Sequence, residues 1–129
     1  MNVSPAKLAE VKAITVAESF TTSQTAAILE VGLETVRRRR QYGKLYAFPY
    51  GRQWRFPTWQ FEAGSPIPGL EVVVPAITLS MHPAFVRGMM LAPRPRLAEG
   101  ETWESPRMFL INHGDPTRVA TIFEALAAL

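Results

Sequence analysis

Apolar and polar positions are interrupted so often by proline and glycine that the pattern predicts short helices. Ser4 followed by Pro5 is typical of a helix start, because serine can cap the first turn and proline already has the backbone angle of that turn. The helix continues through an apolar stripe at helical spacing, Leu8, Val11 and Ile14. Phe20 and Thr21 then predict a short extended piece before the next helix.

Two short helices joined by a tight turn follow this piece. The first helix takes Thr22 or Ser23 as its N-terminal cap and ends near Gly32, where glycine permits the backbone to turn. The second helix covers residues 33–42, and Gly43 closes it in the left-handed conformation. Two short helices with a tight turn between them predict a helix-turn-helix.

Aromatic residues crowd the segment after Gly43 and predict a two-stranded hairpin, or wing, around Tyr50 and Gly51. The wing carries two cations, Arg52 and Arg55. We expect the aromatic residues to form the core beneath the wing and not platforms for stacked bases. The residues concerned are Trp54, Phe56, Trp59 and Phe61.

The segment GSPIPG at residues 64–69 is too broken for regular structure, so we place a boundary there between domains at 1–63 and 64–129. The next segment, EVVVPAITLS, is apolar enough for a strand, but a helix restarting after Pro75 fits equally. A helix is predicted over residues 83–91 and an extended piece over APRPRL. A last helix begins at Asp115-Pro116 and keeps one apolar face, made of Val119, Ile122, Phe123, Leu126 and Leu129.

The fold class that follows is mainly α, with a winged helix-turn-helix and its small β-hairpin wing followed by a small helical C-terminal domain.

The composition of the chain excludes several classes of function. The chain has no cysteine, which excludes a disulfide-stapled fold, cysteine-ligated zinc and thiol catalysis. Only His82 and His113 are present, so we expect no metal site and no cofactor. No apolar run is long enough to span a membrane and no secretory signal begins the chain, so we expect a cytoplasmic protein.

We do not expect an enzyme. Each histidine stands beside a predicted turn, where a lone histidine is usually a surface or capping residue. Glu99, Glu101 and Glu104 cluster on a predicted loop that offers little to hold a pair of carboxylates in place. The sequence also contains no GxGxxG, P-loop or HExxH motif.

Charge is divided between the two parts of the chain. Residues 1–61 carry nine Lys and Arg against four Asp and Glu, whereas residues 62–129 carry five against seven. Between Leu33 and Arg55 there are seven basic residues against one acidic residue. This pattern favours contact with a polyanion in the first part and with a protein in the second.

Four arginines, residues 37–40, stand in a row on the second helix of the helix-turn-helix. Consecutive helical residues point about 100° apart, so the four cannot all face one partner. We expect Thr35, Arg37 and Arg38 to lie nearest the bases of a DNA major groove. Arg39 and Arg40 would contact phosphates or lay their stems on apolar neighbours. The expected phosphate contacts are Arg39, Arg40, Lys44 and Arg55.

The run from Thr21 to Phe61 resembles the winged helix-turn-helix of excisionase and MerR-like DNA-binding domains. The likeness rests on Ala26, Leu29, Val31 and Val36, on the GKL turn at 43–45 and on the RFP at 55–57. This resemblance implies that the second helix and the wing bind duplex DNA, with Thr35, Arg37 and Arg38 in the groove and Arg52 as a wing contact. The sequence departs from the pattern at Glu30, where a turn glycine is usual, and at Arg39 and Arg40, where apolar or aromatic residues are usual.

The remainder is similar to the toxin-binding domain of Xre/MbcA/ParS-type antitoxins. The likeness rests on PTWQF at 57–61, PIPGLEVV at 66–73 and a spaced pattern from Leu97 to Val119 that includes SP, FL and GDP. It implies a cognate toxin with a RES domain, which consumes NAD, and repression of the shared operon by the DNA-binding part. The partner-binding residues in this interpretation are Phe109, Asp115, Arg118, Ile122 and Leu126. The residues alone equally indicate that Phe109 is core and that Asp115 begins a helix.

The leading hypothesis is therefore an antitoxin that neutralises a cognate toxin and binds operator DNA as a homodimer. The alternative is an excisionase-like or transcriptional regulator whose C-terminal half serves only for dimerisation. A third hypothesis is an inhibitor of another protein whose DNA-binding surface is vestigial. The pattern does not say whether the stripe at Leu8, Val11 and Ile14 packs on the same chain or on a second subunit.

Overall fold

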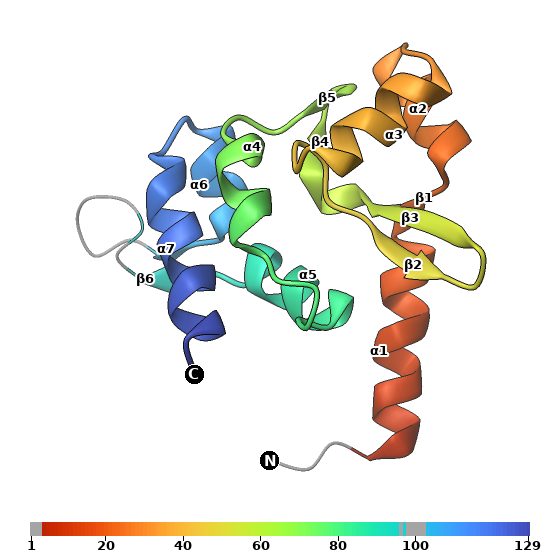
Figure 1. Cartoon of the computed structure of the whole chain (residues 1–129). Helices are drawn as coiled ribbons and strands as arrows, with labels where there is room; N and C mark the ends of the chain where they lie inside the picture. The colour runs from red at the N-terminus through yellow and green to blue at the C-terminus, as the bar shows by residue number, and fades with distance from the viewer. Residues whose placement is uncertain (1–3, 96, 98–102) are drawn as a thin grey trace.

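A computed structural model describes residues 4–95, 97 and 103–129, and it is mainly helical with small antiparallel hairpins, as predicted (Figure 1). On one side lie α1 (Pro5–Ala17), β1 (Ser19–Phe20), α2 (Thr22–Leu29), α3 (Leu33–Gln41), β2 (Phe48–Tyr50), β3 (Gln53–Pro57), the 3-10 helix η1 (Thr58–Gln60) and β4 (Phe61–Glu62). Strand β5 (Ser65–Pro66) pairs with β4. On the other side lie α4 (Leu70–Val73), the 3-10 helix η2 (Val74–Ala76), α5 (Pro83–Leu91), β6 (Arg94–Pro95), β7 (Trp103–Glu104), α6 (Pro106–Ile111) and α7 (Pro116–Ala127).

Four helices begin with the same device, a side-chain cap followed by proline. Ser4 accepts a hydrogen bond from the backbone N–H of Lys7 at 3.1 Å, and Ser105 accepts one from Met108 at 3.1 Å. The caps of α5 and α7 are His82 and Asp115. Proline suits these positions because the first-turn N–H it lacks has no partner within the helix. The starts at 4–5 and 115–116 confirm the prediction, whereas α6 was not predicted although its start has the same signature.

Helix α2 is capped by Thr21 and not by Thr22 or Ser23, so the predicted cap is wrong by one or two residues. The Thr21 hydroxyl accepts a hydrogen bond from the Gln24 N–H at 3.1 Å, while the Gln24 side chain accepts one from the Thr21 N–H at 2.9 Å. This reciprocal pair is a capping box. The glutamine three residues after the threonine is the signal that selects this cap.

A three-stranded sheet with the order β1-β3-β2 supports the helix-turn-helix. Phe48 pairs with Arg55 and Tyr50 with Gln53, so β2 and β3 form the predicted wing with two residues in its turn. Gly51 adopts a φ of +61° in that turn, which matches the first central position of a type II′ hairpin turn. Strand β1 adds to the other edge of β3 and confirms the short extended piece at 20.

Two segments on the C-terminal side differ from the prediction. Ser65 and Pro66 form a strand that pairs with Phe61 and Glu62, although the segment was expected to lack regular structure. The apolar run after Gly69 is helical, as α4 and η2, because its buried valines pack against α7. That helical segment ends at Ala76 and does not restart after Pro75, which lies in the first turn of η2.

The last helix is confirmed as α7, but it ends at Ala127, so Leu129 lies beyond it and is fully exposed. An extended piece was predicted over APRPRL. Its residues Arg94 and Pro95 form β6, which pairs with β7.

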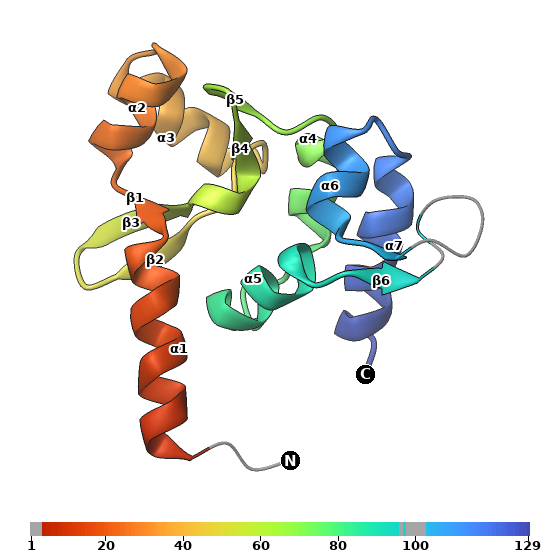
Figure 2. The same cartoon turned by 180° about the vertical axis from the view of Figure 1, so that it is seen from behind.

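In the cartoons, α4 to α7 gather on one side of the molecule, and α2, α3 and the wing lie on the other, while α1 projects away from the sheet (Figures 1 and 2).

One hydrophobic cluster runs through both sides of the molecule, across the boundary that we predicted at 63/64. Arg107 of α6 reinforces the junction, because its guanidinium donates hydrogen bonds of 2.8 Å to the backbone oxygens of Trp59 and Phe61 and to the carboxylate of Glu62. A second link is the ion pair between Arg87 and Glu18, at 2.7 Å. The two sides therefore share one hydrophobic cluster and are joined by polar contacts. Fully buried members of the cluster include Val36, Leu45, Phe56, Leu70, Val86, Leu110, Val119 and Phe123.

Candidate nucleic-acid interface

The turn between α2 and α3 is built on Glu30 in the left-handed conformation, with φ 55° and ψ 45°. The Val31 N–H bonds to the Ala26 carbonyl at 3.0 Å and the Glu30 N–H to the Ala27 carbonyl at 3.3 Å. This is the Schellman arrangement that usually employs glycine. Glu30 therefore performs the geometric role of the turn glycine, and the departure from the resemblance at this position leaves the turn intact.

Helix α3 has one buried and one exposed side. Val36 is fully buried, and Thr35 and Arg39 are half-buried beside it. The exposed stripe follows the i, i+3, i+4, i+7 spacing of a single helix face. It consists of Glu34, Arg37, Arg38 and Gln41.

This stripe changes the predicted set of groove residues. Arg37 and Arg38 lie on the exposed face, as expected, whereas Thr35 lies toward the covered side. Glu34 and Gln41 share the exposed face and were missed. The helical spacing of the four residues could have found them, because Val36 at the opposite side of the wheel marks the buried face. Arg37 and Glu34 also form an ion pair along the stripe.

Arg40 turns toward the wing. Its guanidinium carbon lies 4.0 Å from the centroid of the Trp54 ring, and the residue is half-buried. A cation over an indole face is attracted by the ring quadrupole, so this contact ties the end of α3 to β3. It explains why an arginine stands where an apolar or aromatic residue is usual, since its stem and guanidinium plane take the packing role.

The wing contributes fewer free cations than we expected. Arg52 lies exposed in the β2–β3 turn, and Lys44 is exposed after α3. Arg55 points to α1 and β1, where it donates hydrogen bonds to the Ser19 hydroxyl and carbonyl, both at 2.9 Å, and to the Val16 carbonyl at 3.2 Å. These bonds use Nε and Nη2 of the guanidinium and hold it against α1 and β1, which gives Arg55 a positioning role.

Gln60 fixes the segment between α3 and the wing and was also missed. It is fully buried, and its side chain accepts a hydrogen bond from the Tyr46 N–H at 2.8 Å and donates to the Tyr46 carbonyl at 2.7 Å. It donates a further hydrogen bond of 3.1 Å to the Pro57 carbonyl.

The predicted aromatic core is confirmed for three of its four residues. Phe56, Trp59 and Phe61 are buried, whereas Trp54 lies partly exposed under Arg40.

The five predicted partner-binding residues are divided by the structure. Phe109 is 5% exposed and lies under Gly114, whose α-carbon has no room for a side chain beside that ring, so Phe109 belongs mainly to the core. Ile122 and Leu126 are partly buried, and Ile122 packs against the core. Asp115 and Arg118 are exposed.

Asp115 and Arg118 also have structural roles. Hydrogen bonds from the Thr117 hydroxyl at 2.7 Å and the Thr117 N–H at 3.0 Å lower the pKa of Asp115, with a smaller contribution from the charge of Arg118. Arg118 donates a hydrogen bond of 2.5 Å to the Leu97 carbonyl. Of the predicted acidic cluster, Glu104 accepts a hydrogen bond from Asn112 at 2.7 Å, while Glu99 and Glu101 lie outside the described residues.

His113 follows the end of α6 in the left-handed conformation, with a φ of 63°, and its N–H donates a hydrogen bond of 2.9 Å to the Leu110 carbonyl.

Within residues 4–95, 97 and 103–129, no three His, Asp or Glu side chains lie close enough together to form a metal site. In the same part of the chain, no helix has the length and apolar character needed to cross a membrane.

Comparison with known proteins agrees with this geometry for one part of the chain. A family model described as a helix-turn-helix domain matches residues 19–63, which begin at β1 and end in the turn after β4. Searches among curated proteins and among solved structures find no match. Residues 19–63 are accordingly a helix-turn-helix domain, the kind of module that binds DNA.

Proposed function

We propose that the protein is a DNA-binding regulator that places α3 in the major groove and the wing against the neighbouring backbone. The observation that carries this proposal is the exposed stripe on α3, which presents two arginines, a glutamate and a glutamine within a helix-turn-helix domain. These are the side chains whose hydrogen-bonding groups match base edges. Helix α3 is the second helix of the motif, the one that enters the groove in such domains.

Each member of the stripe has a base that fits its chemistry. Arg37 and Arg38 can donate two hydrogen bonds to guanine, and Gln41 can pair with adenine in the same bidentate way. Glu34 can accept a hydrogen bond from the amino group of cytosine. Because Glu34 also pairs with Arg37 in the unbound protein, DNA binding exchanges that ion pair for contacts with the bases.

Lys44 and Arg52 supply the sequence-independent part of binding. Both are exposed, one directly after α3 and the other at the tip of the wing, so both can reach phosphates without rearrangement. Each phosphate contact releases counterions and increases the salt dependence of binding. Arg40 and Arg55 would contribute indirectly, by holding α3 and β1 against the wing.

The test separates base readout from phosphate contact. Duplexes are selected from a random library with the full chain, and fluorescence anisotropy then measures the Kd for the selected and for scrambled duplexes at several salt concentrations. Arg38→Ala should reduce the preference for the selected duplex by about 1–3 kcal/mol, whereas Lys44→Ala should weaken both duplexes equally and reduce the salt slope by about one.

Lys7→Ala is the matched control for Lys44→Ala, because Lys7 is an exposed lysine on α1, away from α3 and the wing. It should leave both Kd values unchanged. A uniform loss of affinity in Arg38→Ala and Lys44→Ala would contradict the assigned division between base and phosphate contacts, and no selection of duplexes would contradict the proposal as a whole.

We further propose that the regulator is a homodimer. Leu8 and Ile14 remain exposed on α1, which projects from the sheet (Figure 2), and this supports a second subunit as their partner. Two copies could then place their α3 helices in half-sites about 34 Å apart. Sedimentation of the full chain and of Leu8→Ser tests this, since the substitution should shift a dimer toward the monomer.

The finer proposal is that the regulator is an antitoxin, as the resemblance of residues 57–61, 66–73 and 97–119 implies. Exposed Trp103 and Met108 on β7 and α6 support a protein partner for the C-terminal side, because large apolar side chains are common at interfaces. In this proposal the chain acts in the cytoplasm, by binding alone and without a cofactor. Co-expression with its neighbouring genes tests the role, since an antitoxin should co-purify with a small partner whose toxicity it suppresses.

A further inference from the structure

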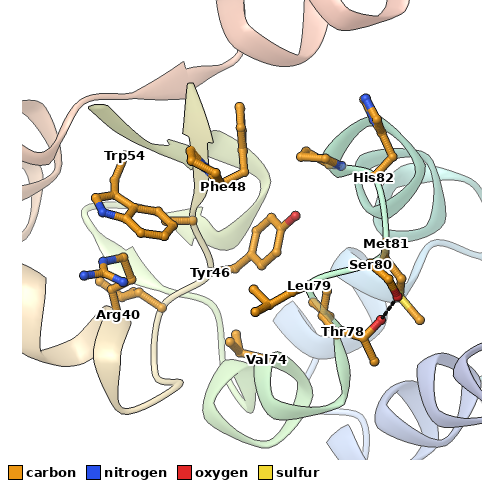
Figure 3. Close-up of a pocket in the computed structure, with 15 residues that line it drawn as sticks. Arg40, Tyr46, Phe48, Trp54, Val74, Thr78, Leu79, Ser80, Met81 and His82 are labelled. Carbon is orange, nitrogen blue, oxygen red and sulfur yellow. Dashed lines mark hydrogen bonds between the residues drawn. The ribbon is translucent and has the colours of Figure 1, made fainter. Parts of the chain in front are cut away.

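A cleft of about 430 Å³ separates the wing from the segment between η2 and α5 (Figure 3). One wall comes from the end of α3 and the wing, through Arg40, Phe48 and Trp54. The opposite wall is the segment 74–83, and Tyr46 lies between the two walls. The volume is within the range of sites that hold a small organic molecule.

The walls combine aromatic surface with hydrogen-bond donors. Tyr46, Phe48 and Trp54 present three aromatic rings to the cleft. The hydroxyl of Tyr46 points into the open space (Figure 3), and burial raises the pKa of this residue to about 12, so the hydroxyl keeps its proton at neutral pH. Arg40 adds a permanent positive charge at the rim, on the Trp54 ring.

No acidic side chain is among the described residues that line the cleft. The Thr78 and Ser80 hydroxyls at the far rim bond to each other at 2.9 Å. Arg40 is therefore the one Lys, Arg, Asp or Glu side chain among the described lining residues, and the donor aimed into the cleft is the neutral Tyr46 hydroxyl (Figure 3). A cationic ligand would find no carboxylate to pair with, whereas an anionic group could accept a hydrogen bond from the Tyr46 hydroxyl.

We propose that this cleft binds a small aromatic carboxylate. The aromatic ring would lie against the rings of Phe48 and Trp54, and the carboxylate would accept a hydrogen bond from the Tyr46 hydroxyl, which points away from Arg40 (Figure 3). Stacked and edge-on aromatic contacts favour a planar ligand over an aliphatic one of equal size.

Leu79 gives the site a second apolar contact. It lines the cleft, yet it is 99% exposed, because nothing within the described chain covers it. A ring in the cleft would offer Leu79 a surface to pack against and remove part of its apolar area from water. The segment around Leu79 would then close over the ligand.

Binding in the cleft would also affect the DNA-binding side, an expectation that rests on the proposed function. Arg40 belongs to α3 and Trp54 to β3, so a ligand that packs on them fixes the position of the wing relative to α3. A ligand that favours one arrangement of these elements changes the affinity of the protein for DNA. Because such coupling is reciprocal, bound DNA changes the affinity for the ligand by the same factor.

The site is tested on the full chain without DNA, with 2-naphthoate as the probe and heteronuclear NMR as the readout. We expect saturable binding at millimolar probe, with the largest amide shifts at residues 46–48 and 78–80. The neutral 2-naphthalenemethanol should bind more weakly, and the cation 2-naphthylmethylammonium weakest. Absence of saturable shifts, shifts elsewhere, or equal binding of the cation would overturn the proposal.

Two pairs of variants assign the contacts. Tyr46→Phe removes only the hydroxyl and should weaken 2-naphthoate about tenfold, while Tyr42→Phe, at an exposed tyrosine that does not line the cleft, should not. Leu79→Ser should also weaken the probe, while Leu129→Ser, at the equally exposed C-terminal leucine, should leave it unchanged. Unchanged binding in Tyr46→Phe would contradict the proposed pose.

The same variants distinguish a small ligand from a protein in the cleft. If Leu79→Ser converts a dimer into a monomer in sedimentation, the cleft is a contact between copies and the proposal is wrong. With DNA, saturating 2-naphthoate should change the Kd for the selected duplex by several-fold. An unchanged Kd would overturn the coupling, whereas failure to bind any duplex would overturn the proposed function and leave the ligand site standing.

Discussion

Helices α3 and α7 illustrate how the two sides of the molecule use the same periodic arrangement for opposite purposes. In α7 the periodic positions are apolar and face inward, where Val119 and Phe123 are buried against α4 and η2. In α3 the residues at the periodic positions are polar and face outward, and Val36 is the one residue of this helix that is fully buried. A helix held by so little apolar surface depends on its neighbours for its position.

The neighbours of α3 are the elements that sequence patterns identify least well. Arg40 stacks on Trp54, Gln60 binds both backbone groups of Tyr46, and Arg55 holds β1. None of these contacts involves residues close in sequence. The comparison suggests that removing apolar surface should unfold the C-terminal side, whereas removing an exposed cation from α3 should affect DNA binding alone.

The largest expected effect is on the apolar face of α7. Phe123→Ala should lower the free energy of unfolding by about 3–5 kcal/mol, because it leaves a cavity at a residue that is 1% exposed. Ile122→Ala, one position away and only partly buried, should cost clearly less. Urea denaturation measures the free energy of unfolding of both variants. Equal losses in Phe123→Ala and Ile122→Ala would contradict the difference in burial between the two positions.

The junction between the two sides comes next. Arg107→Ala should lower the free energy of unfolding by about 2–3 kcal/mol, since the backbone oxygens of Trp59 and Phe61 lose a charged donor. Arg107→Lys should recover only part of the loss, because an ammonium cannot reproduce the planar fork. Two separate unfolding transitions in Arg107→Ala would reveal that this residue couples the two sides, and an unchanged stability would contradict its role.

Alkaline pH should weaken the contact between the wing and the C-terminal side. Burial raises the pKa of Tyr46 from 10.0 in the unfolded chain to about 12 in the folded protein. The stabilisation from keeping this group neutral is complete below pH 10 and is lost as the pH rises through 12, at a cost of about 2 kcal/mol. Denaturation between pH 9 and 12 should show this loss, and Tyr46→Phe should reduce it.

The smallest expected effect is a gain in stability. Glu30→Gly should raise the free energy of unfolding by about 0.5–1 kcal/mol, because glycine adopts the left-handed conformation of this turn without strain. Gly32→Ala is the contrasting variant, since Gly32 has no left-handed backbone angle and open space around its α-carbon. Thermal unfolding compares them, and a loss of stability in Glu30→Gly would point to a role for the carboxylate.

Much of the fold could be predicted from local signals. Proline after a capping residue located α1 and α7, and Gly43 and Gly51 located the end of α3 and the turn of the wing. The prediction was wrong where an apolar run had no local signal to separate strand from helix, as in residues 70–76. There the packing of the valines against α7 selected the helix.

The candidate site was only partly predictable for a similar reason. Four consecutive arginines indicated a DNA-binding helix, but side-chain type alone could not say which of them is exposed. Arg37 and Arg38 lie on the outer face, whereas Arg40 and Arg55 are drawn into contacts with Trp54 and Ser19. Phe109 was named both as a partner residue and as a core residue, and it is 5% exposed beneath Gly114, whose backbone lies over its ring.

The sequence by itself determined the starts of α1 and α7, the end of α3, the wing turn, the helix-turn-helix and the basic charge on it. These follow from caps, glycine and proline, whose effects extend over a few residues. Only the tertiary structure decided which cations are available to DNA, where the cleft beside Tyr46 lies and how the two sides are joined. Those properties depend on contacts such as Arg107 with Trp59 and Phe61, between residues 46 or more positions apart, which local preferences do not encode.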